Sequence, residues 1–517
     1  MNSLFHDYLE SLLQNQVDPV AAGWQLRELS DKTRENPQEL LDALLDSRES
    51  LANTDPAIVG TILRILHGSL LSQGWDQVTS LAMDKIGQLE QAIPPKSTNR
   101  FLLQQLYAIN QQETSLHLLV ESLNLQPPIK WVEAAQVLSP LMQRGDWDVS
   151  VFFPQALSLL PHASLASPLL DLANFVHRNK RVEQHPAFEH VEMLRTLLGE
   201  VVGRLGRFEE DPRTFGSEVP IVQARLAEAV ALAVSLCDAV ALIGDLSSIG
   251  KLHQAMQLRH RRVQSEAAGA LSRLGDDEGK TRLLELLEEP AARLRVIQYA
   301  DELGFGSEVE ERFLTSQAKS EAELALWLSQ PQQMGVPPTK VEVLHTTRCL
   351  WPSFDDLVDV SLVRFEYNFG EQSYSNIGIT GPATFAMSVD VTSLSLSDTY
   401  AIYAGWQAEH DEIFTLAPEN WNDLQREQIS QWKQHLERCE LQDVDGILIG
   451  RFLDETAGVF QAKRDDRSFL VITDGLESIE CVTDAGERSM GALDLFNLYK
   501  GRKILRTFNP DRDLVSE

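Results

Sequence analysis

The chain has 517 residues, too many for one compact hydrophobic core, and this length predicts roughly two to four domains, or one long repeat array with an added domain. Its 45 basic and 76 acidic residues give a formal net charge of -31, which disfavours nucleic acid and anionic membranes as partners. Four cysteines without a CxxC pair, and an N-terminus without a basic start and apolar stretch, favour a cytoplasmic protein.

The first 330 residues are expected to be helical. Asp18-Pro19, Asn36-Pro37 and Asp55-Pro56 each place a good N-cap residue before a proline, which suits the first helical position because proline has no N–H to leave unpaired. Capping boxes are expected at Ser307–Glu310 and Ser320–Glu323. Apolar residues recur with a period near 3.6 in Ile58–Leu71, Val78–Leu89, Phe101–Ile109, Val132–Met142, Leu165–Val176 and Val191–Leu205, and Ala224–Ile243 is apolar on all sides.

Two dipeptides recur at an offset of 29 residues. Leu274-Gly275 returns as Leu303-Gly304, and Gly250-Lys251 returns as Gly279-Lys280. Helices this short are marginal alone in water, so each must bury its apolar face against its neighbours. The spacing therefore predicts a stacked helical repeat.

Residues 262–276 read Arg-Val-Gln-Ser-Glu-Ala-Ala-Gly-Ala-Leu-Ser-Arg-Leu-Gly-Asp. This segment resembles the second helix of a HEAT repeat of the bacterial, phycobilisome-lyase-like type, with its Val-Arg, Ala-Ala and closing Leu-Gly-Asp. Gln264 replaces the usual arginine, which Arg293 keeps in the next repeat. The resemblance covers Leu246–Gly304, and Leu205-Gly206 and Ile243-Gly244 extend it weakly as further closing pairs. It implies a HEAT-like α-solenoid that binds a protein partner on a concave face, and it does not imply lyase activity.

A mainly α chain is expected, with the α-helical solenoid over residues 1–330, a proline- and glycine-rich linker at 331–340, and an α+β domain of unknown function at 341–517. Helices are predicted from Ser397 or Asp398 to about Ile413, from Glu419 to about Glu440, and over Met490–Lys500. Alternating apolar residues predict strands at Val363–Phe369, Tyr374–Ile379, Ala383–Val391, Gly446–Phe452, Gly458–Ala462, Ser468–Thr473 and Ser478–Val482.

The C-terminal domain offers one candidate ligand site, the glycine-rich stretch Asn376–Pro382. Successive main-chain N–H groups there could cradle an anion, although the stretch has no phosphate-loop lysine and a tight turn is the simpler interpretation. His410, flanked by carboxylates, could act as a general acid or base, with a solvated helix end as the alternative. The predicted ligand-binding residues are Asn376, Gly378, Gly381 and His410.

No metal site, cofactor or catalytic residue is predicted. His345 and Cys349 fall on an expected strand, where positions four apart are roughly 13 Å distant. His435 and Cys439 fall one helical turn apart but lack two further ligands. Both pairs are interpreted as packing residues.

Two basic islands stand out from the acidic background, at 177–181 and 259–262. If both projected to one edge, they could bind an acidic partner or a phosphate; otherwise they cap helix ends and balance nearby carboxylates. Their candidate partner-binding residues are Arg178, Lys180, Arg181, Arg259, Arg261 and Arg262. The leading hypothesis is a non-enzymatic protein-interaction scaffold of unknown partner. The alternatives are an enzyme or small-molecule sensor with its site in the C-terminal domain, and nucleic-acid binding through the islands.

Overall fold

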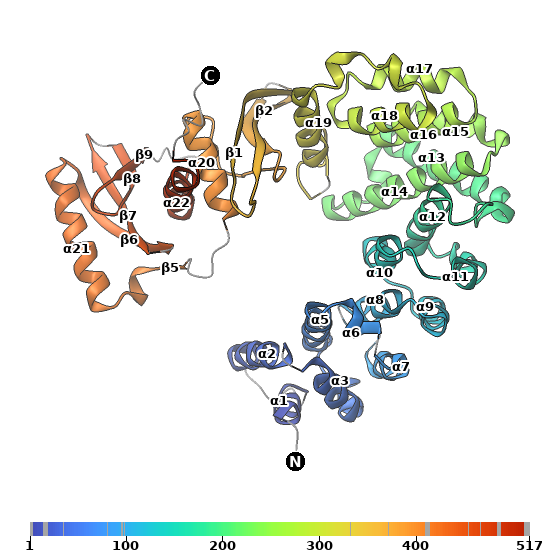
Figure 1. The fold of residues 1–517 in the computed structure, drawn as a ribbon, viewed down its shortest axis with the longest axis horizontal. Coiled ribbons are helices and arrows are strands. Elements are labelled where there is room, and N and C mark those ends of the chain that lie inside the picture. Colours follow the sequence, from blue (N-terminus) through green and yellow to red (C-terminus); the bar gives the residue numbers. More distant parts are fainter. Residues whose placement is uncertain are drawn as a thin grey trace. The chain divides into compact units, whose positions relative to one another are not determined.

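The computed structural model describes residues 4–13, 19–34, 36–79, 81–94, 97, 99–330, 332–370, 372–408, 414–452, 454–465, 467–482 and 488–510. Its contacts divide the chain into two compact parts, unit 1 (Met1–Leu283) and unit 2 (Leu284–Glu517). The described part of unit 1 contains helices and turns, whereas unit 2 combines helices with two antiparallel sheets (Figure 1). The chain is therefore mainly helical with an α+β region toward its C-terminal end, as predicted.

Unit 1 is built from short helices joined by brief turns. The predicted starts at Pro19, Pro37 and Pro56 are confirmed, and the Asp55 side chain accepts a hydrogen bond from Ala57 N at 2.8 Å. The helices are α1 (Leu4–Leu13), α2 (Pro19–Thr33), α3 (Pro37–Asp46), α4 (Arg48–Leu51), α5 (Pro56–Ser72), α6 (Trp75–Thr79), α7 (Met83–Ala92), α8 (Phe101–Asn110), α9 (Glu113–Leu125), α10 (Trp131–Gln143), α11 (Val149–Ala156), α12 (Ala163–Arg178), α13 (Val191–Glu210), α14 (Val219–Ile243), α15 (Ile249–Met256), α16 (Arg261–Arg273) and α17 (Asp277–Leu286), which spans the division between the units.

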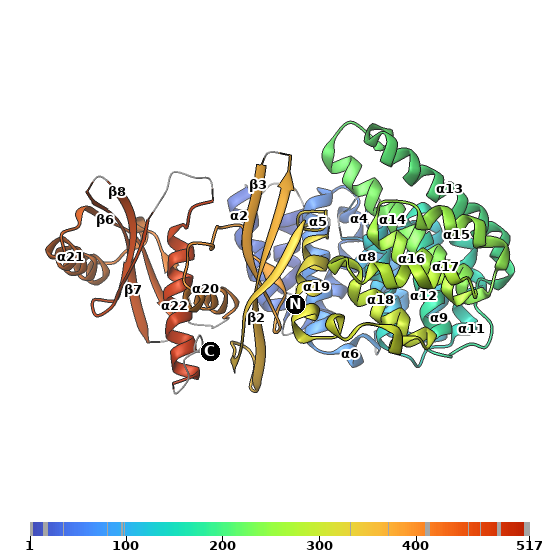
Figure 2. The same ribbon diagram turned by 90° about the horizontal axis from the view of Figure 1, so that it is seen from above.

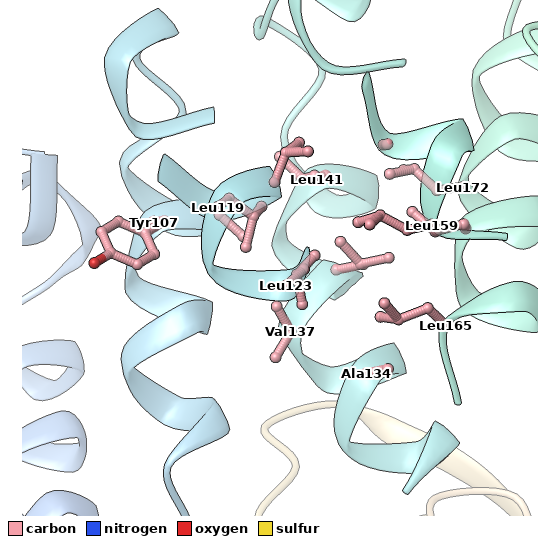
Figure 3. Close-up of a cluster of buried hydrophobic side chains, with 14 of the residues drawn as sticks. Tyr107, Leu119, Leu123, Ala134, Val137, Leu141, Leu159, Leu165 and Leu172 are labelled. Atoms are coloured by element: carbon pink, nitrogen blue, oxygen red, sulfur yellow. The ribbon is translucent and has the colours of Figure 1, made fainter. Parts of the chain in front are cut away.

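The helices after α7 pack in two rows. Helices α8, α10, α12, α14 and α16 contact one another in succession, and we call them the even row. Helices α9, α11, α13 and α15 lie alongside and form the odd row. One continuous core runs from Phe5 to Leu271, and Figure 3 shows a section of it in which Leu119, Val137 and Leu165 come from α9, α10 and α12. Each helix therefore buries its apolar face against its neighbours.

Three helix ends share one glycine cap, in which a left-handed glycine is followed by a residue whose N–H bonds back into the last turn. The glycines are Gly244 after α14, Gly275 after α16 and Gly304 after α18 (Pro290–Leu303), with φ of 81°, 85° and 80°. The bonds from Asp245 N to Val240 O, Asp276 N to Leu271 O and Phe305 N to Ala300 O measure 3.0, 3.0 and 2.9 Å.

Three other predicted signals of helix starts and ends were wrong. Leu205-Gly206 closes no helix, because α13 continues through it to Glu210. The capping boxes at Ser307 and Ser320 are also absent: Ser307 lies in a 3₁₀ turn, and Ser320 lies inside α19 (Ser316–Leu328). The true cap of α19 is Thr315, whose hydroxyl accepts from Ala318 N at 3.1 Å.

Unit 2 has two antiparallel sheets. The first contains β1 (Lys340–Leu350), β2 (Leu357–Phe369), β3 (Gln372–Thr380) and β4 (Phe385–Ala386), in that order. The second contains β5 (Phe414–Leu416), β6 (Gln442–Phe452), β7 (Glu455–Arg464), β8 (Arg467–Thr473) and β9 (Ser478–Val482). Of the predicted strands only Ala383–Val391 fails, since just Phe385 and Ala386 pair with a neighbour. The remaining helices are α20 (Leu396–Gln407), α21 (Asp423–Arg438) and α22 (Ala492–Phe508).

The division between the units falls earlier than the linker expected at 331–340. Leu324 and Leu328 of α19 pack on Val363 and Phe365 of the first sheet, so this helix belongs to unit 2. The proline- and glycine-rich segment joins α19 to β1 within that unit.

Helix α14 is, within the described residues, the one helix long and apolar enough to cross a membrane. Its buried residues run from Ala229 to Ala241, and it contacts α12, α13 and α16. An all-round apolar helix of this kind is typical of a protein core, in agreement with the inner position expected for Ala224–Ile243.

Candidate functional site

A cluster of charged side chains spans three successive helices of the even row. Asp171 is affected electrostatically by Arg262, Asp238 and Glu266, and Arg178 forms an ion pair with Asp238. Arg273 interacts electrostatically with His177, the residue directly before Arg178, and lowers the pKa of its imidazole. We call this set the charged cluster; its members are Asp171 and Arg178 of α12, Asp238 of α14, and Arg262, Glu266 and Arg273 of α16.

Asp171 lies at the solvent-facing part of the cluster. Its side chain is exposed, and its Oδ1 accepts a hydrogen bond from Ser235 Oγ at 2.6 Å. Desolvation by the surrounding protein nevertheless raises the pKa of this carboxyl group to about 6, against the opposing effects of Ser235 and Arg262.

The Arg178–Asp238 pair joins α12 to α14. Nε of Arg178 donates to Asp238 Oδ2 at 3.3 Å, while its terminal nitrogen donates to Oδ1. The two side chains are 23% and 14% exposed, so the pair is largely withdrawn from water. Breaking such a pair leaves an uncompensated charge, and its main role is therefore to fix how the two helices meet.

Behind the cluster runs a buried hydrogen-bond relay. Ala187 N donates to Nδ1 of His185 at 3.1 Å, so the ring proton lies on Nε2, which donates to Asn174 Oδ1 at 3.0 Å. Asn174 Nδ2 in turn donates to Ser235 O at 3.1 Å. Burial lowers the pKa of His185 to about 3, so the imidazole is neutral at physiological pH.

The island at 177–181 is largely committed to contacts within unit 1. Arg178 pairs with Asp238 as described. Arg181 donates to Trp147 O at 2.6 Å and lies over the Trp147 ring, 4.5 Å from its centroid. Lys180 is exposed and has a left-handed backbone with φ of 56°, which ends α12.

The island at 259–262 is only partly committed. Main-chain N of the exposed Arg259 donates to Glu209 Oε1 at 2.5 Å, and Arg261 Nη1 donates to Gln264 Oε1 at 2.9 Å. Arg262 is exposed and interacts electrostatically with Asp171 of α12. Asp171 precedes Arg178 by seven residues on the same helix, which corresponds to about 10 Å along the helix axis. The carboxylates of Asp171 and Asp238 lie among these arginines, so both signs of charge occur where the two islands approach each other.

Three of the predicted ligand-binding residues, Asn376, Gly378 and Gly381, make packing or turn contacts within unit 2. Asn376 is buried in β3; its Nδ2 donates to Met387 O at 3.1 Å and to Val389 O at 2.9 Å. A Cβ on Gly378 would lie 2.7 Å from Leu324 of α19, and Gly381 turns with φ of 116°. Most of the expected loop is therefore strand, followed by a glycine turn. His410 lies outside the described residues.

The His345–Cys349 pair has local contacts, whereas His435 and Cys439 are exposed at the end of α21 and are not core packing residues. Nδ1 of His345 lies 3.0 Å from the Tyr400 hydroxyl, and Cys349 is buried on β1. In the part of the chain that the structure describes, no three or more His, Cys, Asp or Glu side chains gather in a way that could hold a metal ion.

No family model matches the chain, and neither a curated protein nor a solved structure matches it. The resemblance to HEAT repeats therefore depends on the residues of Leu246–Gly304 alone.

Acid is expected to destabilise unit 1 through its buried histidines. Burial lowers the pKa of His185 to about 3 and that of His260 to about 4, so below pH 6.5 the unfolded chain binds protons that the folded chain does not. The free energy of unfolding should fall with pH from 6.5 to 4, by about 1.4 kcal/mol per pH unit for each histidine. Asp171, whose pKa is raised, opposes this below pH 6, but weakly because water reaches it.

Urea unfolding of the native chain and of His185→Gln at pH 7.5, 6.5, 5.5 and 4.5 measures this effect. The variant should lose stability less steeply with acid than the native chain does. Equal slopes would show that His185 does not carry the pH dependence.

Proposed function

We propose that the protein is a non-enzymatic scaffold that binds a protein partner on the even row of a HEAT-like α-solenoid. The observation that carries the proposal is the charged cluster, which presents both signs of charge across α12, α14 and α16 with Asp171 and Arg262 exposed. Charges on successive helices of one row are spaced along a surface, as recognition of an extended partner requires.

The packing of unit 1 supports the solenoid. Each helix of the even row contacts the next, the core is continuous from Phe5 to Leu271, and α14 and α16 end in the same glycine cap. Such arrays have neighbour contacts in place of one central core, and they expose one face of a helix row over a long distance.

The charges define the chemistry of the partner. A surface that carries Asp171 beside Arg262 favours a partner segment with the complementary alternation of charge, which fixes the register of binding. The net charge of -31 favours a partner that is basic as a whole, because the field of the protein speeds its approach.

The alternatives gain no support from the placement of their residues. Asn376, Gly378 and Gly381 make packing contacts in β3 and in the turn after it, so these three residues add no support to the enzyme or sensor alternative, while His410 lies outside the described residues. Nucleic-acid binding through the two islands needs their cations to be available, whereas Arg178 is paired with Asp238 and Arg181 is bonded to Trp147 O. The proposal places the scaffold in the cytoplasm, with unit 2 as a second recognition module.

Reversing one exposed charge of the cluster should abolish capture of the partner. Asp171→Lys places a cation where the partner's own cation is expected, and since like charges across an interface cost several kcal/mol, recovery of the partner should fall at least about fivefold. The measurement is quantitative mass spectrometry of proteins retained from cell extract by the immobilised full chain.

Glu113→Lys is the matched control. Glu113 is a carboxylate on α9 of the odd row with a 73% exposed side chain, so this variant makes the same change of net charge away from the even row. Equal recovery by the native chain and Asp171→Lys, or equal losses in the two variants, would contradict binding through the even row.

A further inference from the structure

A pocket of about 520 Å³ lies where α13 and α14 are joined by a 3₁₀ turn, Pro212–Phe215. It is lined by three arginines, Arg204, Arg207 and Arg225, together with Thr214 and Phe215. Arg204 and Arg207 are one turn apart on α13, and Arg225 comes from the first half of α14, which packs against α13 (Figure 2). This volume suits a small ligand or a single side chain.

Phe215 contacts two of the three arginines of the pocket. It is 4% exposed, and its ring lies 4.9 Å from that of Phe208. The Arg204 guanidinium sits 5.6 Å from the ring centroid, and Arg225 Nη1 donates to Phe215 O at 2.8 Å. Two of the arginines are thus fixed by contacts that leave most of their N–H groups available.

The backbone beside Phe215 is specialised. Gly216 has φ of 136° and ψ of 179°, a conformation that is essentially restricted to glycine. A Cβ there would also lie 3.4 Å from Ile221 and 3.8 Å from Arg225. The turn that presents Phe215 and its carbonyl to Arg225 therefore depends on this glycine.

None of the three arginines has a carboxylate partner among the residues that the structure describes. This is unexpected in a chain with 76 acidic and 45 basic residues, and elsewhere in unit 1 the arginines Arg178 and Arg195 are paired with Asp238 and Asp245. Three guanidinium groups at one pocket repel one another, and an anion bound between them relieves that repulsion.

Two acidic side chains close to the turn in sequence, Asp211 and Glu209, are already hydrogen-bonded to other arginines. Asp211 accepts from Arg213 Nε at 2.9 Å and from Arg213 N at 3.1 Å, and Glu209 accepts from Arg259 N. These two carboxylates are therefore bonded to Arg213 and Arg259 and not to the arginines of the pocket.

We propose that this pocket binds a dianionic phosphate group. Guanidinium groups donate parallel pairs of N–H bonds to phosphate oxygens, and the Phe215 ring offers an apolar wall to whatever carries the phosphate. The carrier is either a phosphorylated small molecule or a phosphorylated side chain, and the two sources share this chemistry. The site is separate from the charged cluster and does not depend on the scaffold proposal.

Isothermal titration calorimetry of the full chain tests the site, with inorganic phosphate, a phosphorylated sugar, a phosphoserine peptide and the same peptide without phosphate as probes. We expect saturable binding of the first three at one site at low salt and none of the unphosphorylated peptide. Tighter binding of the sugar or of the phosphopeptide identifies the source. No binding of any phosphorylated probe at low salt overturns the proposal.

Arg207→Ala should weaken phosphate binding at least tenfold. The Arg207 side chain is exposed and forms no hydrogen bond or ion pair among the described residues, so its loss should leave the melting temperature unchanged and separate binding from folding. The control is Arg426→Ala on α21, which removes the same charge from an exposed site in unit 2. Native affinity in Arg207→Ala, or an equal loss in Arg426→Ala, would also overturn the site.

Discussion

Replacing Gly501 with alanine is expected to destabilise unit 2 by about 3 kcal/mol or more, because two helix backbones touch at this position. A Cβ on Gly501 of α22 would overlap the carbonyl oxygen of Ala401 in α20 and lie 2.8 Å from Gly405 N. A Cβ on Gly405 would likewise overlap the carbonyl oxygen of Asn497. Neither atom can move away without separating helices that together cover much of the core of the unit.

Urea unfolding of the full chain, combined with hydrogen exchange of the β6–β8 peptides, measures this loss and locates it. Gly203→Ala in α13 is the control, because a Cβ there meets nothing within 4 Å and alanine favours a helix. A Gly501→Ala chain within 0.5 kcal/mol of the native one, or protected normally in unit 2, would show that the helices do not meet backbone to backbone.

Replacing Glu90 with alanine is expected to cost unit 1 about 3 to 5 kcal/mol. Glu90 is only 6% exposed, and its carboxylate accepts from Ser122 Oγ at 2.5 Å and from the Tyr107 hydroxyl at 3.3 Å. Arg100, also buried, lies 4.0 Å from it, and burial lowers the pKa of that guanidinium while the charge of Glu90 opposes the shift. The alanine variant leaves the charge of Arg100 without its counterion, although the guanidinium keeps its hydrogen bonds to Ile93 O and Glu90 O. It also leaves the hydroxyl groups of Ser122 and Tyr107 without this acceptor.

Ser122→Ala provides the comparison, since it removes the hydrogen bonds of Ser122 Oγ to Glu90 and from Gln104 Nε2 and leaves the charge of Arg100 balanced; about 2 kcal/mol is expected. Urea denaturation followed by circular dichroism gives both values. Equal losses in Glu90→Ala and Ser122→Ala would show that the buried charge pair contributes nothing beyond the hydrogen bonds of Ser122.

Local signals predicted local structure well. The proline-led starts, the 3.6-residue periodicity and the Leu-Gly closing pairs at Gly275 and Gly304 all report on chemistry within one helix, and the structure confirms them. Leu205-Gly206 failed because the same letters also occur inside a helix when the next turn continues, as α13 does to Glu210. Alternation at Ala383–Val391 failed because a strand also needs a neighbour, and only two of its residues have one.

The sites depend on residues far apart in the chain, so the sequence predicted them poorly. The basic island at Arg178 was recognised, but its counterion Asp238 lies 60 residues away on α14. The arginine pocket was missed, because Arg204 and Arg207 are separated from Arg225 by a turn whose course the sequence does not reveal. Gly216, directly after that turn, was the one local feature of the sequence that could have indicated a specialised turn there.

Photo-cross-linking tests most directly whether the even row binds the partner. A benzophenone side chain in place of Asp171 on α12, or in place of Glu113 on α9, reports which row lies against a captured protein. We predict a cross-linked partner from position 171 and none from position 113. Cross-links from position 113 alone, or from neither position while the partner remains bound, would contradict the scaffold proposal.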